Sequence, residues 1–162
     1  MFNVEIIVAL PVETQGLFEK EKINVSYSGI GKINAAQAAL EAILKNNVNH
    51  IINLGTAGSH KFETHSLIEL SGTTQRDMDL TPLGFKLGET PFDPISGLIT
   101  IDHFYTDLQK GVCGTGDRFE TSFDQPDYDL VDMEAYAIAK ICKKHNVKFT
   151  SIKYSTDGSD EH

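Results

Sequence analysis

Three acidic side chains stand out in this chain of 162 residues because of where they fall along it. Glu13 follows the apolar run of residues 3–10, and Asp157 follows the run VKFTSIKY. Glu134 lies at the start of the apolar-periodic stretch EAYAIAKIC. Carboxylates accept hydrogen bonds and can exchange protons with a bound molecule. Because ligands collect at the carboxyl ends of strands in an α/β sheet, the spacing predicts an acidic site at one sheet edge.

The sequence Asp132-Met133-Glu134 also has a purely structural interpretation. Asp132 is a suitable N-cap and Glu134 would lie in the first helical turn, where a negative charge meets the positive end of the helix dipole. Together these effects stabilise a helix by roughly 1 to 2 kcal/mol. On that interpretation Met133 is a packing residue. These residues alone do not choose between the two interpretations.

The elements that would position these side chains alternate between strands and helices. Residues 3–10 read as a strand buried on both faces. Residues 31–46 read as a helix with one apolar stripe, made of Ile33, Ala36, Leu40, Ile43 and Leu44. A second helix is marked by Val131, Ala135, Ile138, Ala139 and Cys142. Each helix is followed by a polar turn, a strand and a polar loop. We also expect strands near residues 67–70, 97–104 and 110–113.

This alternation predicts the fold class. We expect an α/β fold, a three-layer αβα sandwich whose central sheet is mixed and mostly parallel, with helices on both faces. No composition break or linker divides the chain, so residues 1–162 are expected to form a single domain that buries about 70% of its unfolded surface.

Composition excludes several classes of function. The net charge of -9 repels nucleic acid and anionic membranes, and no basic patch offsets it. The N-terminal apolar run carries Glu5 and reads as a strand, not a signal peptide. Cys113 and Cys142 fit a reducing cytoplasm. The six histidines lack metal-ligand spacing, so no metal and no cofactor are expected.

The glycine-rich stretches SGIGK and GTAGSH suggest phosphate binding only weakly. SGIGK has neither the spacing of a P-loop nor that of a dinucleotide-binding fingerprint. Glycines of this kind often serve only tight turns. GTAGSH is the stronger candidate for a binding role because it follows a predicted strand.

Six stretches, taken in order, resemble the nucleoside phosphorylase and nucleosidase family. They are ALPVET, SGIGKINAAQAAL, INLGTAGSH, GTGDRF, VDMEAYAIAKIC and IKYSTDGSD. The resemblance runs nearly end to end and is greatest to the 5'-methylthioadenosine/S-adenosylhomocysteine nucleosidases. The Met-Glu pair followed by a strand ending in Thr-Asp is its most specific part.

The resemblance implies hydrolysis of a purine N-glycosidic bond that releases adenine. Such chemistry protonates the departing base and stabilises an oxocarbenium-like sugar while water attacks. Asp157 matches the family's acid, which donates a proton to purine N7. Glu13 matches the carboxylate that orients and deprotonates water. Thr56 stands where the family places a small residue near that water.

The substrate-binding residues carry over in the same way. Glu134 matches the carboxylate that accepts hydrogen bonds from the ribose hydroxyls, and Met133 would lie against the ribose. Phe119 matches an aromatic residue that stacks on the base, and the backbone at Glu120 would read the purine edge. In the family a neighbouring subunit completes the site, which implies a homodimer with Leu83 and Pro91 as lid residues.

Departures from the family pattern bear on substrate and nucleophile. Lys153 replaces an arginine near the water, and Glu120 replaces an apolar residue beside the base. Phosphate-using members hold their anion with arginines, one of them just before the glycine-rich strand end, where this chain has Asn53 and Leu54. A dianion would be poorly held without a guanidinium, so water is the expected nucleophile. Arg76 and Lys32 keep a phosphorylase open as an alternative.

Two other functions remain open. The segment between GETPF and GTGDRF lacks a helix that the family usually has. The chain also ends five residues after Asp157, so the resemblance implies that the usual C-terminal helix is lacking. A purine-binding module without turnover is therefore one alternative, and an α/β scaffold for protein contacts is another.

Overall fold

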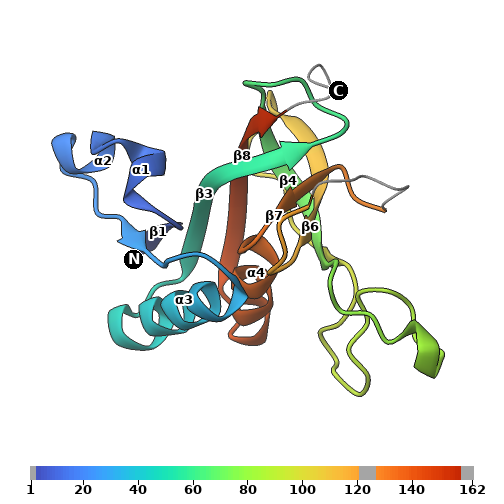
Figure 1. The fold of residues 1–162 in the computed structure, drawn as a ribbon. Coiled ribbons are helices and arrows are strands. Elements are labelled where there is room, and N and C mark those ends of the chain that lie inside the picture. The colour runs from blue at the N-terminus through green and yellow to red at the C-terminus, as the bar shows by residue number, and fades with distance from the viewer. Residues whose placement is uncertain (1–2, 121–126, 158–162) are drawn as a thin grey trace.

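The computed structural model describes residues 3–120 and 127–157 (Figure 1). Its strands are β1 (Val4–Val8), β2 (Ser26–Tyr27), β3 (His50–Ser59), β4 (Leu67–Gln75), β5 (Ile99–Thr100), β6 (Gln109–Thr115), β7 (Leu130–Asp132) and β8 (Lys148–Asp157). Its helices are α1 (Pro11–Thr14), α2 (Leu17–Lys20), α3 (Lys32–Asn46) and α4 (Ala135–Lys144), with a short 3-10 helix, η1 (Thr81–Leu83).

The described strands all belong to one sheet. The order β2-β1-β3-β7-β6-β4-β5 is joined by β8, which pairs with both β3 and β4. Strands β3, β8, β4, β6 and β7 therefore pair in a closed ring. Parallel and antiparallel pairs both occur, so the predicted mixed sheet is confirmed.

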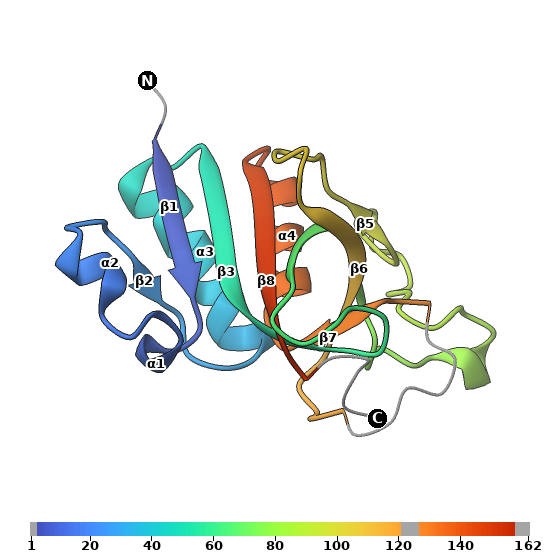
Figure 2. The same cartoon turned by 90° about the horizontal axis from the view of Figure 1, so that it is seen from above.

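Helices α3 and α4 cover the same face of the sheet (Figure 2). They share one apolar cluster, in which alanines of α3 meet Ile138 and Cys142 of α4 over Ile7 and Ile51 of the sheet. The three-layer arrangement is not confirmed, because no long helix lies on the opposite face within the described residues. The long connection between β4 and β6 forms only η1, β5 and loops there.

The buried face of α3 differs from the predicted apolar stripe. Ala35, Ala39 and Ala42 are buried, whereas Ile33 is 81% exposed and Leu44 is 67% exposed. Small side chains allow a helix to approach its neighbours closely, so the alanine face packs inward. The second helix also begins later than predicted, because residues 130–132 pair with β6 as strand β7.

Strands β3 and β8 run further than the sequence suggested. The stretch Gly55–Ser59 was expected to be a loop but continues β3, and the residues after Tyr154 continue β8. The two strands lie parallel, with Thr56 opposite Tyr154 and Gly58 opposite Asp157 after a register shift. The extension carries candidate site residues to the ends of adjacent strands.

Candidate active site

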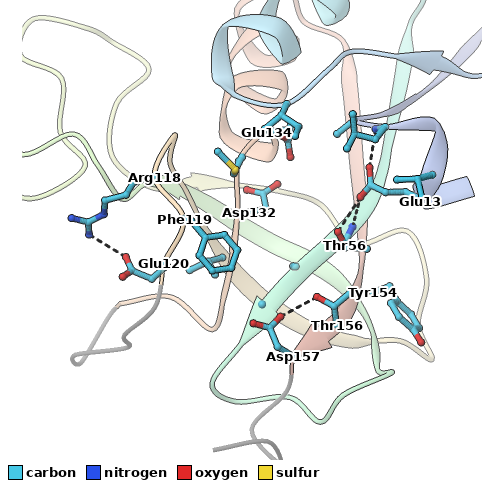
Figure 3. Close-up of a pocket in the computed structure, with 18 of the residues that line it drawn as sticks. Glu13, Thr56, Arg118, Phe119, Glu120, Asp132, Glu134, Tyr154, Thr156 and Asp157 are labelled. Atoms are coloured by element: carbon cyan, nitrogen blue, oxygen red, sulfur yellow. Dashed lines mark hydrogen bonds and ion pairs between the residues drawn. The ribbon is translucent and has the colours of Figure 1, made fainter.

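A cavity of about 580 Å³ lies where the predicted acidic side chains meet (Figure 3). Glu13 reaches it from α1, Glu134 from the N-cap of α4, and Asp157 from the end of β8. These side chains are far apart in the sequence, and the fold brings all three to one hollow. The three carboxylates predicted to converge at one sheet edge therefore do lie around one cavity.

Glu13 is fixed through both carboxylate oxygens. Its Oε1 accepts hydrogen bonds from the backbone N–H and the hydroxyl of Thr56, each at 3.0 Å. Its Oε2 accepts a hydrogen bond from the N–H of Leu10 at 2.9 Å. Since those donors come from β3 and from the residue before α1, the carboxylate is held between two elements. Thr56 lines the cavity beside it.

Glu134 is buried, with only 8% of its surface exposed. Its Oε1 accepts a hydrogen bond from the N–H of Gly31 at 2.9 Å, just before α3 begins. Burial, reinforced by the negative charge of Asp132, raises the pKa of Glu134 above its ordinary value, although Lys153 opposes the shift. Met133 also lines the cavity. The carboxylate thus faces the cavity in a setting that disfavours its charge.

The glycine stretch SGIGK supports this carboxylate. Gly31 has a φ of 96°, which a residue with a side chain rarely adopts. The next N–H, that of Lys32, donates to Asp117 Oδ1 at 2.8 Å. The first amides of α3 therefore meet carboxylates of this chain. Sequence reasoning did not find this role, although two glycines immediately before a helix were a signal of special backbone geometry.

Asp157 lies directly over Gly58 of the neighbouring strand. A Cβ at Gly58 would stand 3.1 Å from Asp157 Oδ2 and 3.2 Å from its Oδ1. The Thr156 hydroxyl donates to Asp157 Oδ1 at 2.9 Å. The side chain of Asp157 points toward the cavity, across from Phe119 (Figure 3). The missing side chain at Gly58 leaves the space that this carboxylate occupies.

Lys153 is placed differently from its prediction as a substrate-binding residue. It is 1% exposed, and it is not among the residues that line the cavity. Its Nζ lies 2.8 Å from Asp132 Oδ2 behind the cavity wall. The prediction is corrected, because β8 turns this side chain toward the buried end of β7 and the start of α4.

Asp132 is not the N-cap of α4, which is Glu134, but its carboxylate still binds the first helical N–H and also pairs with Lys153. Its Oδ2 accepts the N–H of Ala135 at 2.8 Å, and its Oδ1 accepts the hydroxyl of Thr115 at 2.5 Å. Burial raises the pKa of Asp132, but the Lys153 ammonium and these donors outweigh it and hold the pKa below the ordinary value. Burial lowers the pKa of Lys153, but the neighbouring acids, Asp132 foremost, outweigh burial and raise the pKa above its ordinary value. Both side chains are therefore charged at neutral pH.

The opposite end of the cavity carries Phe119 and a cluster of charges. Phe119 is 77% exposed. Glu120 Oε2 lies 3.1 Å from Arg76 Nη1 and 3.3 Å from Arg118 Nη2. Arg76 also donates to the carbonyl of Arg118. The guanidinium groups at this cavity are therefore engaged by a carboxylate of the same chain, a pairing that the sequence did not reveal.

The predicted lid residues lie away from this cavity. Leu83 is 71% exposed on η1, and neither it nor Pro91 lines the cavity within one chain. The segment from Asp77 to Gly97 projects from the sheet (Figures 1 and 2). Leu87 and Phe92 add to the exposed apolar surface of this projecting segment.

Metal-ligand clusters and membrane-spanning helices are both absent from the described part of the chain. Across residues 3–120 and 127–157, no group of three or more histidine, cysteine, aspartate or glutamate side chains is arranged to hold a metal ion. Within the same ranges, every helix is too short or too polar to cross a membrane. Cys113 and Cys142 are both free thiols in the core.

Comparison with known sequences finds one protein family and relatives that are nucleosidases. The family model described as the phosphorylase superfamily matches residues 13–162. A 5'-methylthioadenosine/S-adenosylhomocysteine nucleosidase of Staphylococcus haemolyticus (strain JCSC1435) is 31% identical over 94% of this chain and 76% of its own length. An aminodeoxyfutalosine nucleosidase of Helicobacter pylori (strain J99 / ATCC 700824) is 26% identical over 91% of this chain and 72% of its own.

Solved structures share the fold. The crystal structure of Campylobacter jejuni 5'-methylthioadenosine/S-adenosyl homocysteine nucleosidase superposes with a TM-score of 0.88 at 22% identity. The superposition covers 100% of this chain and 88% of that structure. A futalosine hydrolase structure from Helicobacter pylori strain 26695 gives a TM-score of 0.87 at 22% identity, over 99% of this chain and 86% of that structure.

Proposed function

Because the chain belongs to the phosphorylase superfamily, we propose that it hydrolyses the N-glycosidic bond of a purine nucleoside or thionucleoside and releases adenine. The substrate would be of the 5'-methylthioadenosine/S-adenosylhomocysteine type, as in the names of similar relatives. The single observation that carries the proposal is the meeting of Glu13, Glu134 and Asp157 at one cavity.

Cleavage needs an acid on one side of the sugar and a base on the other. Asp157 would donate a proton to purine N7 as the bond to the sugar breaks. Glu13 would orient a water molecule on the opposite side and take its proton, with Thr56 beside that water. The three hydrogen bonds to Glu13 support this role, because a fixed carboxylate costs little reorganisation when it acts.

Glu134 would hold the sugar. A carboxylate accepts hydrogen bonds from two adjacent hydroxyls, and the ribose 2'- and 3'-hydroxyls are such a pair. The N–H of Gly31 fixes one oxygen of Glu134, so the carboxylate has a defined orientation before substrate arrives. Met133 would lie against the ribose ring.

Phe119 would stack on the purine, and the backbone of Glu120 would read its outer edge. The position of Phe119 opposite Asp157 supports this arrangement (Figure 3). An aromatic ring that is 77% exposed without ligand gains a partner when a base binds.

Water is the proposed nucleophile because the chain's candidate phosphate ligands are already paired. Arg76 contacts Glu120. Lys32 Nζ lies 2.6 Å from Asp77 Oδ1 and 3.7 Å from Asp117 Oδ2. Asn53 is 2% exposed and donates from its side chain to the carbonyl of Ile7. A phosphate dianion would have to displace these carboxylates to gain a cation.

Three further features belong to the proposal. A homodimer would bring the projecting segment, with Leu83 and Pro91, over the partner's cavity, which its exposed apolar side chains support. The free, buried thiols of Cys113 and Cys142 support a cytoplasmic location. The three-layer sandwich would need a helix layer opposite α3 and α4.

A nucleoside panel assayed by chromatography tests the function. We expect adenine release from 5'-methylthioadenosine or S-adenosylhomocysteine without added phosphate, with Glu13→Gln as the inactive control. Adenine that appears only with phosphate would indicate a phosphorylase. Calorimetric binding of a nucleoside without turnover would indicate a binding module instead.

A further inference from the structure

The ammonium of Lys153 lies behind the cavity wall, near the part of the cavity where Glu13 and Glu134 are located. Its anchor, Asp132, is the second residue before Glu134, and both acids line the cavity. Lys153 is 1% exposed, so water does not screen its charge from its neighbours. The side chain does not reach the cavity itself. Its influence there must therefore be electrostatic.

Gly55 leaves the ammonium close to Glu13 as well. Gly55 pairs with Lys153 across β3 and β8. A Cβ built on Gly55 would stand 3.5 Å from Lys153 Nζ and 3.4 Å from Glu13 Oε1. Both charged groups therefore flank the same empty position, and no side chain of residue 55 separates them. The ammonium thus pairs with Asp132, attracts the charge of Glu134 and lies across residue 55 from Glu13.

The groups that face this cation come from several elements. Asp132 is on β7, Cys113 is on β6, Glu134 is at the N-cap position of α4, and Glu13 is on α1. Burial strongly raises the pKa of the Cys113 thiol, so this side chain is neutral. Without that ammonium, the negative charge of Asp132 would act unopposed on Glu134 and favour its protonation.

We infer that Lys153 is a positioning residue whose buried ammonium, anchored by Asp132, favours the ionised form of Glu134 at the cavity. The inference rests on the proposed function only in that Glu134 is the carboxylate assigned to the sugar. It accounts for a lysine that is buried behind the cavity wall and does not line the cavity. Asp132, which carries the opposite charge, acts on Glu134 in the opposite sense.

This difference in sign separates an electrostatic role from a structural one. Lys153→Met removes the cation, so Glu134 should protonate at a higher pH than in the unaltered protein. Asp132→Asn removes an anion and leaves the cation, so Glu134 should protonate at a lower pH. A purely structural role would disturb the fold in both variants without opposite shifts. Lys153→Arg keeps the charge and should stay close to the unaltered protein.

The decisive measurement is a titration of the Glu134 carboxyl carbon by NMR in protein labelled with ¹³C-glutamate. Glu134→Gln identifies the signal. We expect the midpoint to rise by about one pH unit in Lys153→Met and to fall by a similar amount in Asp132→Asn. If Lys153→Met does not fold, Asp132→Asn is compared with Asp132→Asn/Lys153→Met, which differ only at residue 153. In that comparison the midpoint should be higher without the lysine.

Kinetics provide a second readout, which also tests the proposed function separately. The acidic limb of the pH profile of kcat/KM for adenine release should move in the same directions as the NMR midpoints. Midpoints that stay constant, or that move the same way in Lys153→Met and Asp132→Asn, overturn the inference even if adenine is released. Opposite NMR shifts without adenine release support the inference and overturn the proposed function.

Discussion

The two ends of the cavity differ in how firmly their side chains are held. At the sugar end, Glu13 accepts three hydrogen bonds, and Glu134 is buried against the N–H of Gly31. At the base end, Phe119 is mostly exposed, and Asp157 receives a hydrogen bond from the adjacent Thr156. The sugar end is thus ordered by contacts between distant elements, whereas the base end depends on local contacts and on the strand end itself.

This contrast indicates which groups are already in position before a substrate binds. Groups that act on developing charge are most effective when they are fixed in advance. The carboxylates proposed to hold the ribose and activate water meet that condition. The proposed base-binding groups would gain part of their order from the purine, so substitutions there should affect catalysis and binding more than stability.

The largest effect is expected for Asp157→Asn, which removes the proton that the base end would supply. We expect kcat to fall by about 10² to 10⁴-fold while nucleoside affinity changes little. Thr156→Val is the matched control, because it removes only the hydroxyl that donates to Asp157. A kcat for Asp157→Asn close to that of the unaltered protein would remove Asp157 from the mechanism.

Phe119→Ala should weaken binding without unfolding the protein. Stacking of a base on an aromatic ring is worth about 1 to 3 kcal/mol, so KM should rise roughly tenfold. The melting temperature should stay unchanged, since the ring is already 77% exposed. Leu44→Ala, an exposed substitution on α3 outside the cavity, serves as control. An unchanged KM would show that the base does not lie on Phe119.

A pair of glycine substitutions compares the two ends directly. In Gly58→Ala the new methyl group would stand 3.1 Å from Asp157 and 3.2 Å from Val131 Cγ2, so the carboxylate must move. In Gly55→Ala the methyl group would meet Glu13 and Lys153 only at ordinary contact distances of 3.4 and 3.5 Å. We expect kcat to fall several-fold more in Gly58→Ala. An equal fall in kcat in the two variants would contradict the prediction that residue 58 is the more crowded position.

The smallest effect is a gain in stability for Glu134→Gln. The folded protein holds the pKa of Glu134 above its ordinary value of 4.5, so ionisation of this side chain opposes folding once the pH exceeds that value. Glutamine carries no charge and can still accept the N–H of Gly31. The melting temperature should therefore rise by a few degrees at neutral pH, and the gain should vanish below about pH 4.

Activity of Glu134→Gln completes the comparison. The variant should lose most of its turnover, because an amide cannot accept hydrogen bonds from two hydroxyls as a carboxylate does. Thermal unfolding at several pH values, alongside adenine release, measures both effects. A variant that is less stable at neutral pH would show that the ionised Glu134 carboxylate stabilises the folded protein, contrary to this prediction.

The family, the mixed sheet and the three carboxylates at the cavity could all be predicted from the amino-acid sequence. The carboxylates could be found from local pattern, since Glu13 and Asp157 lie at or just beyond strand ends and Glu134 precedes an amphipathic helix. The family came from the resemblance of six motifs. Helix α3 was also predicted nearly to its ends. Its buried face was not, because periodicity favoured the larger Ile33 and Leu44 over the alanines that pack closely.

Which charges face the cavity and which pair with one another could not be predicted from the sequence and emerged from the packing of the strands. Lys153 pairs with Asp132 behind the wall, and Arg76 pairs with Glu120, although both cations were available to a substrate on the sequence alone. The closed ring of strands and the shared face of α3 and α4 were equally hidden. The physical reason is common to these cases. Pairing across strands depends on the register of the strands and on the direction of each side chain. Both are fixed only when the strands pack together in the folded chain.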